Sequence, residues 1–372
     1  MLRIGIKGLE IDPKFRKAAN LVFVIDVSGS MGREDRLGLV KKALRLLVDE
    51  LNSKDRVGLI IYGSQAREVL PPTSITDRQK ILDAIERLCT GGSTNAEAGI
   101  RLGYQMAECC FEKGKINRVI LCSDGVANVG VTGADDLLKQ IKRFADKGIT
   151  LSSIGFGMGN FNDILLEKLG NKGNGHYAYV DDIAEARRIF VDNLTGNLQV
   201  IARDVKIQVD FDPEVVRSYR LLGYENRDVA DDKFRDDKED GGEIGAGHET
   251  TALYELKFTK DSKRWAQSKS LGTIFIRYKD PESFEVTEIS RSIKMNVFKG
   301  EFENTSPHFQ LAAAAAEFSE IMRDSYWARD SKLQAVQDVL KGVHEQVSTP
   351  EVVELMHLVA TAKQLKDHLA EK

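Results

Sequence analysis

The sequence predicts an α/β domain with a doubly wound, mostly parallel sheet, followed by a second, β-rich domain with C-terminal helices. Between about residues 20 and 199, short runs of Ile, Val and Leu alternate with helical patterns. This alternation is typical of a parallel sheet covered by helices on both faces. After residue 200, polar and apolar residues alternate, which indicates antiparallel strands with one face in water.

The first region contains five or six strand–helix units. Strands are expected at 21–27, 56–62, 116–123 and 149–156, with a weaker strand at 176–180 and a short edge strand at 67–70. Helices are expected at 37–51, 77–88, 96–111, 134–147, 164–169 and 183–198. Ile, Val and Leu dominate these strands, as in buried parallel strands.

The chain is expected to divide into four parts. Residues 1–19 hold an opening strand that has no place in the first strand–helix unit, so we expect it to pair with the second domain's sheet. Residues 20–199 form the α/β domain, residues 200–300 an antiparallel β domain, and residues 301–372 about three helices. A Gly-rich, acidic stretch at 225–247 has few apolar residues and is expected to form a long loop.

The bulk composition excludes several classes of protein. A net charge of -4 is unsuited to a general nucleic-acid binder or a binder of anionic membranes, since both require a basic surface. No apolar run approaches the roughly 20 residues of a membrane-spanning helix. The four cysteines lack the spacing of a disulfide framework or a zinc site. The sequence does not predict the oligomeric state.

Oxygen-bearing side chains cluster after two of the predicted strands. Asp26, Ser28 and Ser30 stand two residues apart at the carboxyl end of the first buried strand. Thr94 lies in the loop at the start of a predicted helix, and Asp124 directly follows another buried strand. Ligands of open α/β sheets bind at this edge. We therefore predict that these five residues converge on one site.

The donor set predicts the kind of ion. It contains carboxylates and neutral hydroxyls but no His or Cys, which selects a hard cation and favours Mg²⁺ or Mn²⁺, with Ca²⁺ as a third option. Because several ligands are neutral, the ion keeps part of its charge. The site is expected to accept an Asp or Glu carboxylate from a protein partner.

The pattern Asp26-x-Ser28-x-Ser30, Thr94 and Asp124-Gly125 resembles the von Willebrand factor A family over about residues 20–199. The resemblance implies a Rossmann-like fold and a metal-ion-dependent adhesion site. It also implies that Ser28, Ser30 and Thr94 bind the metal directly, whereas the two aspartates act largely through water. In integrin-type relatives the last helix of the domain shifts with the state of the site.

The rest of the chain resembles the bacterial YfbK-like group at residues 2–8, 220–227, 242–248 and 251–255. Its members often carry an export or lipoprotein segment, which implies an extracytoplasmic place in the periplasm or at the cell surface. The first eight residues show no secretion signal. The sequence by itself therefore leaves a cytoplasmic location open.

Alternatives remain for the motif and for the acidic stretch. The residues from Asp26 to Ser30 could simply cap a helix. The acidic stretch could bind a second ion or be a solvated loop, through side chains at Asp228, Asp231, Asp232, Asp236, Asp237, Glu239, Asp240 and Glu243.

The predicted metal site is compatible with three functions. The first is a non-enzymatic binding module, the second a metal-dependent hydrolase or phosphotransferase, and the third an assembly scaffold whose metal is engaged by the chain's own acidic stretch. Asp26-Val27-Ser28 lacks the second aspartate of an Asp-x-Asp nucleophile loop. No general base is placed nearby. We therefore expect a binding module and no enzymatic activity.

Overall fold

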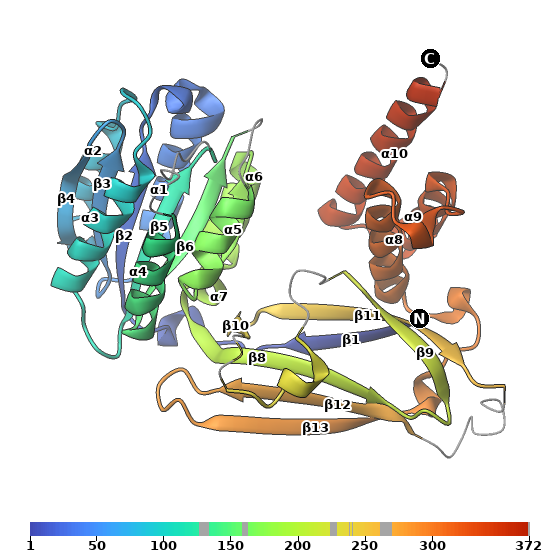
Figure 1. Ribbon diagram of the computed structural model, residues 1–372. Coiled ribbons are helices and arrows are strands. Elements are labelled where there is room, and N and C mark those ends of the chain that lie inside the picture. Colours follow the sequence, from blue (N-terminus) through green and yellow to red (C-terminus); the bar gives the residue numbers. More distant parts are fainter. Residues whose placement is uncertain are drawn as a thin grey trace.

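An α/β unit and a group of C-terminal helices stand on a pair of antiparallel sheets (Figure 1). The computed structural model describes residues 1–125, 134–157, 163–223, 229–237, 239, 241–260 and 270–370. The predicted fold class, a mostly parallel sheet with helices plus a β-rich part and C-terminal helices, is confirmed.

The sheet of the α/β unit has six strands in the order β4-β3-β2-β5-β6-β7. The strands are β2 (Ala19–Asp26), β3 (Arg56–Tyr62), β4 (Ala66–Ser74), β5 (Ile116–Ser123), β6 (Ile149–Phe156) and β7 (Tyr177–Val180). All pairs are parallel except β3 with β4, and β4 is longer than the expected edge strand. Every residue of β2 and of β6 is buried, which agrees with their largely apolar composition.

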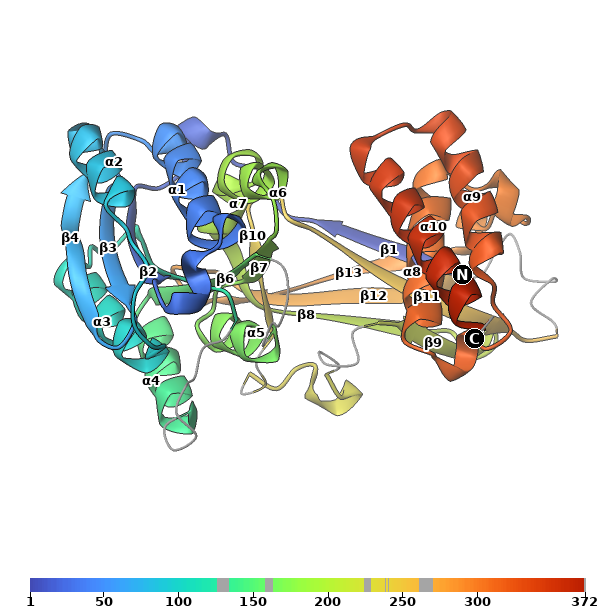
Figure 2. The same cartoon turned by 90° about the horizontal axis from the view of Figure 1, so that it is seen from above.

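Helices cover both faces of this sheet (Figure 2). One layer contains α1 (Leu39–Glu50), α2 (Arg78–Glu86), α6 (Ile183–Arg187) and α7 (Leu194–Leu198), and the other contains α3 (Ala96–Cys109), α4 (Ala134–Asp146) and α5 (Asp163–Lys172). Side chains of β2 alternate between the two layers: Phe23 packs in the first core and Val24 in the second. Two separate cores therefore hold the central strand in place.

The single helix predicted over 183–198 is broken in the structure. Between α6 and α7 the chain forms a π-helical turn, Arg188–Asp192. The amide of Asn193 donates to the carbonyl of Arg188, five residues earlier, at 2.9 Å. The side-chain amide of Asn197, in α7, donates to the carbonyl of Ile189 at 2.8 Å. This hydrogen bond supplies a partner for a backbone carbonyl within the wider turn.

Two antiparallel sheets form the second part of the molecule. One has the order β1-β11-β9 and the other β10-β8-β12-β13. Their strands are β1 (Leu2–Lys7), β8 (Val200–Phe211), β9 (Val216–Leu222), β10 (Gly242–Gly245), β11 (Glu249–Phe258), β12 (Ser270–Lys279) and β13 (Val286–Lys294). Their shared core includes Ile4, Phe211, Tyr254 and Leu271. The first strand, β1, thus pairs with β11, although the whole α/β unit lies between the two strands in the sequence.

The acidic stretch is more ordered than its composition predicts. Its last part forms β10, which pairs with β8. The carbonyl of Asp236 accepts from Lys206 Nζ at 2.6 Å, and the carboxylate of Asp237 pairs with Arg277 at 2.7 Å. Basic side chains of β8 and β12 therefore hold the stretch against the sheet, which its own few apolar residues could not do. Residues 224–228, 238 and 240 lie outside the described part.

Three helices follow the sheets: α8 (Pro307–Met322), α9 (Leu333–Gln346) and α10 (Pro350–Ala370). They share a small core around Val336, Leu340 and Val359. An ion pair between Arg220 of β9 and Glu320 of α8, 2.8 Å long, joins them to the three-stranded sheet. Among the described residues, no helix has both the length and the apolar character needed to cross a membrane.

The chain enters and leaves the α/β unit side by side. The amide of Lys17, just before β2, donates to the side chain of Gln199, just after α7, at 3.0 Å. Next to them, Arg16 and Asp55 form a buried ion pair of 2.6 Å. Both connections lie at the amino-terminal edge of the parallel strands. The opposite, carboxyl-terminal edge remains for the predicted site.

Candidate functional site

The loop after β2 and the loop before α3 are joined by backbone hydrogen bonds. The amide of Gly91 donates to the carbonyl of Val27 at 2.7 Å, and the amide of Gly29 donates to the carbonyl of Gly92 at 3.1 Å. Gly92 has a φ of +91°, a conformation that glycine adopts without strain. These contacts bring the loop of Thr94 beside Asp26 and the two serines.

The turn after β2 collects three of the predicted side chains. Asp26 is fully buried, and its Oδ1 accepts a hydrogen bond of 2.8 Å from the amide of Ser28. The hydroxyls of Ser28 and Ser30 lie 3.1 Å apart. Ser28 is buried and Ser30 is half-buried, so the pair of hydroxyls lies between the interior and the solvent.

Ser123, at the end of β5, is a contact of Asp26 that is not among the five predicted ligands. Its hydroxyl donates to Asp26 Oδ2 at 3.2 Å and accepts from the amide of Gly125. Burial raises the pKa of Asp26, the negative charge of Asp124 raises it further, and hydrogen bonds from Ser28 and Ser123 partly oppose the shift. The hydrogen bonds thus favour the ionised carboxylate in a place where burial disfavours it.

Asp124 is held by an arginine that the sequence analysis also missed. Arg36 Nη1 donates to Asp124 Oδ2 at 2.5 Å and to the backbone carbonyl of Ser30 at 2.9 Å. The side chain of Asp124 is fully buried, and that of Arg36 is 11% exposed. No local pattern marks Arg36, because it lies six residues beyond Ser30 in a turn between the motif and α1.

Thr94 is brought to the site by its backbone. It is half-buried, and the side chain of Asn95, which follows it, caps α3 by accepting from the amide of Ala98 at 3.1 Å. The structure therefore joins Asp26, Ser28 and Ser30 by direct hydrogen bonds and links Asp124 to them through Arg36. The loop that contains Thr94 contacts theirs through the backbone of Gly91 and Gly92.

The acidic side chains outside this site do not form a second metal cluster among the described residues. Among the described residues, no group of three or more His, Cys, Asp or Glu side chains is placed to hold a metal ion. In the acidic stretch Asp237 pairs with Arg277, and Glu243 lies 3.8 Å from Arg203. Asp228 and Asp240 fall outside the described residues. Within the described part, the acidic stretch forms ion pairs with the protein's own arginines.

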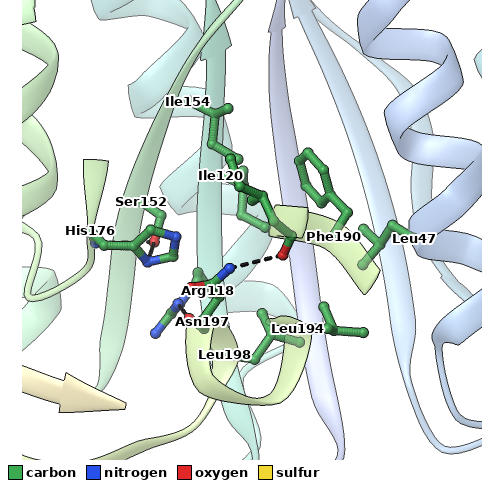
Figure 3. A pocket seen from close by; sticks show the side chains of 11 residues that line it. Leu47, Arg118, Ile120, Ser152, Ile154, His176, Phe190, Leu194, Asn197 and Leu198 are labelled. Carbon is green, nitrogen blue, oxygen red and sulfur yellow. Dashed lines mark hydrogen bonds between the residues drawn. The ribbon is translucent and has the colours of Figure 1, made fainter. Parts of the chain in front are cut away.

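A small cavity lies at the other edge of the sheet, beneath α7 (Figure 3). Its volume is about 20 Å³, enough for a single water molecule. Most of its lining is aliphatic, and its polar side chains include Arg118, Ser152 and His176. Arg118 Nε donates to Thr150 Oγ1 at 3.0 Å, and the guanidinium also reaches the carbonyl of Asn197 in α7. All of its lining residues belong to the α/β unit, and the cavity is too small for a ligand.

Comparison with known proteins identifies both parts of the chain. Residues 20–193 match the family described as von Willebrand factor type A domain, and residues 196–365 match the one described as Uncharacterized protein YfbK, C-terminal. The chain is 32% identical over 375 residues to the uncharacterized protein YfbK of Escherichia coli (strain K12), covering 96% of this chain and 64% of that protein.

Two further similar proteins cover different shares of the chain. Inter-alpha-trypsin inhibitor heavy chain H3 of Homo sapiens is 27% identical over 195 residues, which is 50% of this chain and 20% of that protein. A solved structure, von Willebrand factor type A from Catenulispora acidiphila, is similar with a TM-score of 0.50 and 16% identity, covering 92% of this chain and 87% of that one. The chain thus spans less than two thirds of the curated relatives it matches.

The resemblance inferred from the Asp-x-Ser-x-Ser pattern and from the C-terminal stretches is confirmed by these matches. The parallel sheet with its loops at the carboxyl edge agrees with the first family. The chain belongs to the von Willebrand factor A domain proteins that carry a YfbK-type C-terminal domain.

Proposed function

We propose that Asp26, Ser28, Ser30, Thr94 and Asp124 hold a divalent cation, Mg²⁺ or Mn²⁺, and that the protein uses it to bind an Asp or Glu carboxylate of a partner protein. The observation that carries the proposal is the pair of serine hydroxyls, 3.1 Å apart, beside the buried carboxylate of Asp26. The family match to von Willebrand factor type A domains supports it.

The donor set suits a hard cation. The hydroxyls of Ser28 and Ser30 lie side by side and offer two neutral oxygens. Together with two carboxylates, and without His or Cys, such a compact set of oxygen donors suits Mg²⁺ or Mn²⁺.

The charges around the hydroxyls suit a receptor for an anion. Asp26 and Asp124 are both buried, and Arg36 offsets the charge of Asp124. When bound, the cation supplies a Lewis-acidic face with an open position for a carboxylate. Ser30 is half-buried, so the position nearest to it faces the solvent. We therefore assign the protein a binding role in place of a hydrolytic one.

We propose that the bound carboxylate comes from another molecule and not from the chain's own acidic stretch. The scaffold alternative requires the acidic stretch to reach the site. Its described members instead contact β8 and β12 through Lys206 and Arg277. Those contacts belong to the antiparallel sheets, away from the loops that hold Ser28 and Ser30 (Figure 1).

A titration of the intact chain with Mn²⁺, followed by the electron paramagnetic resonance signal of free Mn²⁺, tests the ion. We expect binding by the wild type and its loss in the double variant Ser28→Ala/Ser30→Ala, because two ligands are removed. Ser74→Ala, which deletes a hydroxyl at the end of β4, should bind Mn²⁺ as the wild type does. An unchanged titration in the double variant would contradict the assignment.

The partner is tested by affinity capture from a cell-envelope extract. A protein should be retained with Mg²⁺, released by a chelator and absent when the bait carries Asp26→Ala. Its retention should fail when its own exposed acidic residues are amidated. Capture that survives the chelator, or release of phosphate from extract components that depends on Asp26, would point to another function.

A further inference from the structure

We infer that Arg36 is a built-in counter-charge of the metal site, which weakens binding of the ion by the protein and thereby strengthens the attraction of the bound ion for a carboxylate. The inference rests on the proposed function. It concerns the buried ion pair between Arg36 Nη1 and Asp124 Oδ2, 2.5 Å long, which lies directly beneath the loop of Ser28 and Ser30.

The guanidinium is fixed in this place. It donates from the same nitrogen to Asp124 and to the carbonyl of Ser30, so it touches two segments of the site. Its Nε is buried and has no hydrogen-bond partner among the described residues. The position of the charge is therefore set by Asp124 and by the loop, at the cost of one unsatisfied donor.

The backbone around Arg36 is shaped to admit it. Glu34–Gly38 forms a π-helical turn, a widened turn that occurs frequently at functional sites. Opposite, Gly157 has a φ of +88°, and a Cβ there would lie 2.5 Å from Arg36 Cγ. The neighbouring charges are matched elsewhere: Glu34 pairs with Lys42 and Arg33 with Asp35.

The sign of the effect follows from the charge count. Asp26 and Asp124 contribute two negative charges, and Arg36 returns one positive charge to the same buried region. A divalent ion is neutralised less by a protein site with a net charge of about -1 than by a site with a net charge of about -2. Arg36 should therefore lower affinity for the ion and raise the affinity of the loaded site for an anion.

A purely structural role predicts the opposite sign. If Arg36 only held Asp124 in the correct orientation, its removal would weaken metal binding. If it acts as a counter-charge, removal strengthens metal binding. The direction of the change therefore distinguishes the two roles.

The test is a Mn²⁺ titration of the full chain, with free Mn²⁺ measured by electron paramagnetic resonance. We expect Arg36→Gln to bind Mn²⁺ about ten-fold more tightly than the wild type. Arg36→Lys, which keeps the charge, should bind nearly as the wild type does. Arg33→Gln removes the same charge from the same loop, but its side chain is 60% exposed, so it should leave affinity within about two-fold.

Acetate serves as the probe for the anion. Adding it should tighten apparent Mn²⁺ binding by the wild type more than by Arg36→Gln, because the loaded site of the variant carries less positive charge. Weaker or unchanged Mn²⁺ binding by Arg36→Gln would overturn the inference. Absence of Mn²⁺ binding by the wild type would instead overturn the proposed function, so the two failures are distinguishable.

Folding of the variant has its own readout. Loss of Arg36 leaves the buried carboxylate of Asp124 without this cation, which lowers the stability of the metal-free form. Because the variant is expected to bind Mn²⁺ more tightly, Mn²⁺ should raise the Tm of Arg36→Gln by more than that of the wild type. If the Gln variant unfolds below the assay temperature, Arg36→Met, whose unbranched chain fits beside Gly157, replaces it with the same expected direction.

Discussion

His176 shows how a single residue can be held in one protonation state by its surroundings. Its side chain hydrogen-bonds Ser152 Oγ through Nδ1 at 3.2 Å, and its Nε2 is buried with no hydrogen-bond partner among the described residues (Figure 3). Burial lowers the pKa of His176 to about 3, and the charges of Arg118 and His248 lower it further. The folded protein therefore favours the neutral imidazole.

This pKa predicts a specific loss of stability in acid. The unfolded chain binds the proton below its ordinary pKa of 6.5, whereas folded His176 does not until about pH 3, so stability is present above pH 6.5 and falls as the pH drops between these values. In His176→Gln, the free energy of unfolding should fall less steeply with decreasing pH than in the wild type. The two slopes should differ by up to about 1.4 kcal/mol per pH unit.

Urea unfolding at several pH values between 7 and 4 measures the slope. His308→Gln is the matched control, because His308 is exposed. Equal slopes for the wild type and His176→Gln would show that His176 is protonated in the folded protein.

At the scale of elements, close contact between α3 and β2 depends on a glycine. A Cβ at Gly103 would lie 2.5 Å from Val24 Cγ2 and 3.3 Å from Val119 Cγ1. The helix therefore approaches the central strands more closely than any larger residue would allow. This matters for the site, because α3 begins just after Thr94 and β2 ends at Asp26.

We expect Gly103→Ala to lower the free energy of unfolding by about 1–3 kcal/mol, since the added methyl group must displace Val24 or the helix. Gly342→Ala offers the opposite case in α9, where a Cβ has nothing within 4 Å. There the substitution should stabilise by about 0.5–1 kcal/mol through helix propensity alone. Denaturant unfolding compares the two, and a neutral Gly103→Ala would mean that the helix moves away freely.

The elements also show what the sequence could predict. Buried strands such as β2, and the grouping of Asp26, Ser28 and Ser30 after it, were predictable, because apolar runs and an oxygen-rich turn are local patterns. Arg36 and Ser123 were not, since their roles depend on contacts with Asp124 and Asp26 that only the folded chain creates. The break before α7 and strand β10 were missed for the same reason: partners distant in sequence determine both. The four-part division of the chain, the ligand set and the metal remain predictions.

At the scale of the whole molecule, the second part is discontinuous in sequence. β1 precedes the α/β unit yet pairs with β11, and Ile4 of β1 is buried in the core between the two sheets. The α/β unit is therefore inserted after the first strand of the part that follows it. Stability of the two parts can be probed separately, because residues 20–199 contain no Trp and Trp327 lies against Arg220 of β9.

Ile4→Ala is expected to destabilise the second part by about 2–5 kcal/mol, through a cavity in its core. The unfolding midpoint followed by Trp fluorescence should fall, while Mn²⁺ affinity at low denaturant stays as in the wild type. Leu9→Ala, a similar truncation at a side chain that is 76% exposed, should leave both unchanged. Loss of Mn²⁺ binding in Ile4→Ala would show instead that the two parts fold as one unit.

The paired connections at Lys17 and Gln199 have a mechanical consequence. Force applied to a ligand at the carboxyl edge would pass through the α/β unit to the two connecting segments at Lys17 and Gln199. A hydrogen bond joins these segments. Each connection carries only part of the tension, whereas a domain on a single linker loads one segment with all of it.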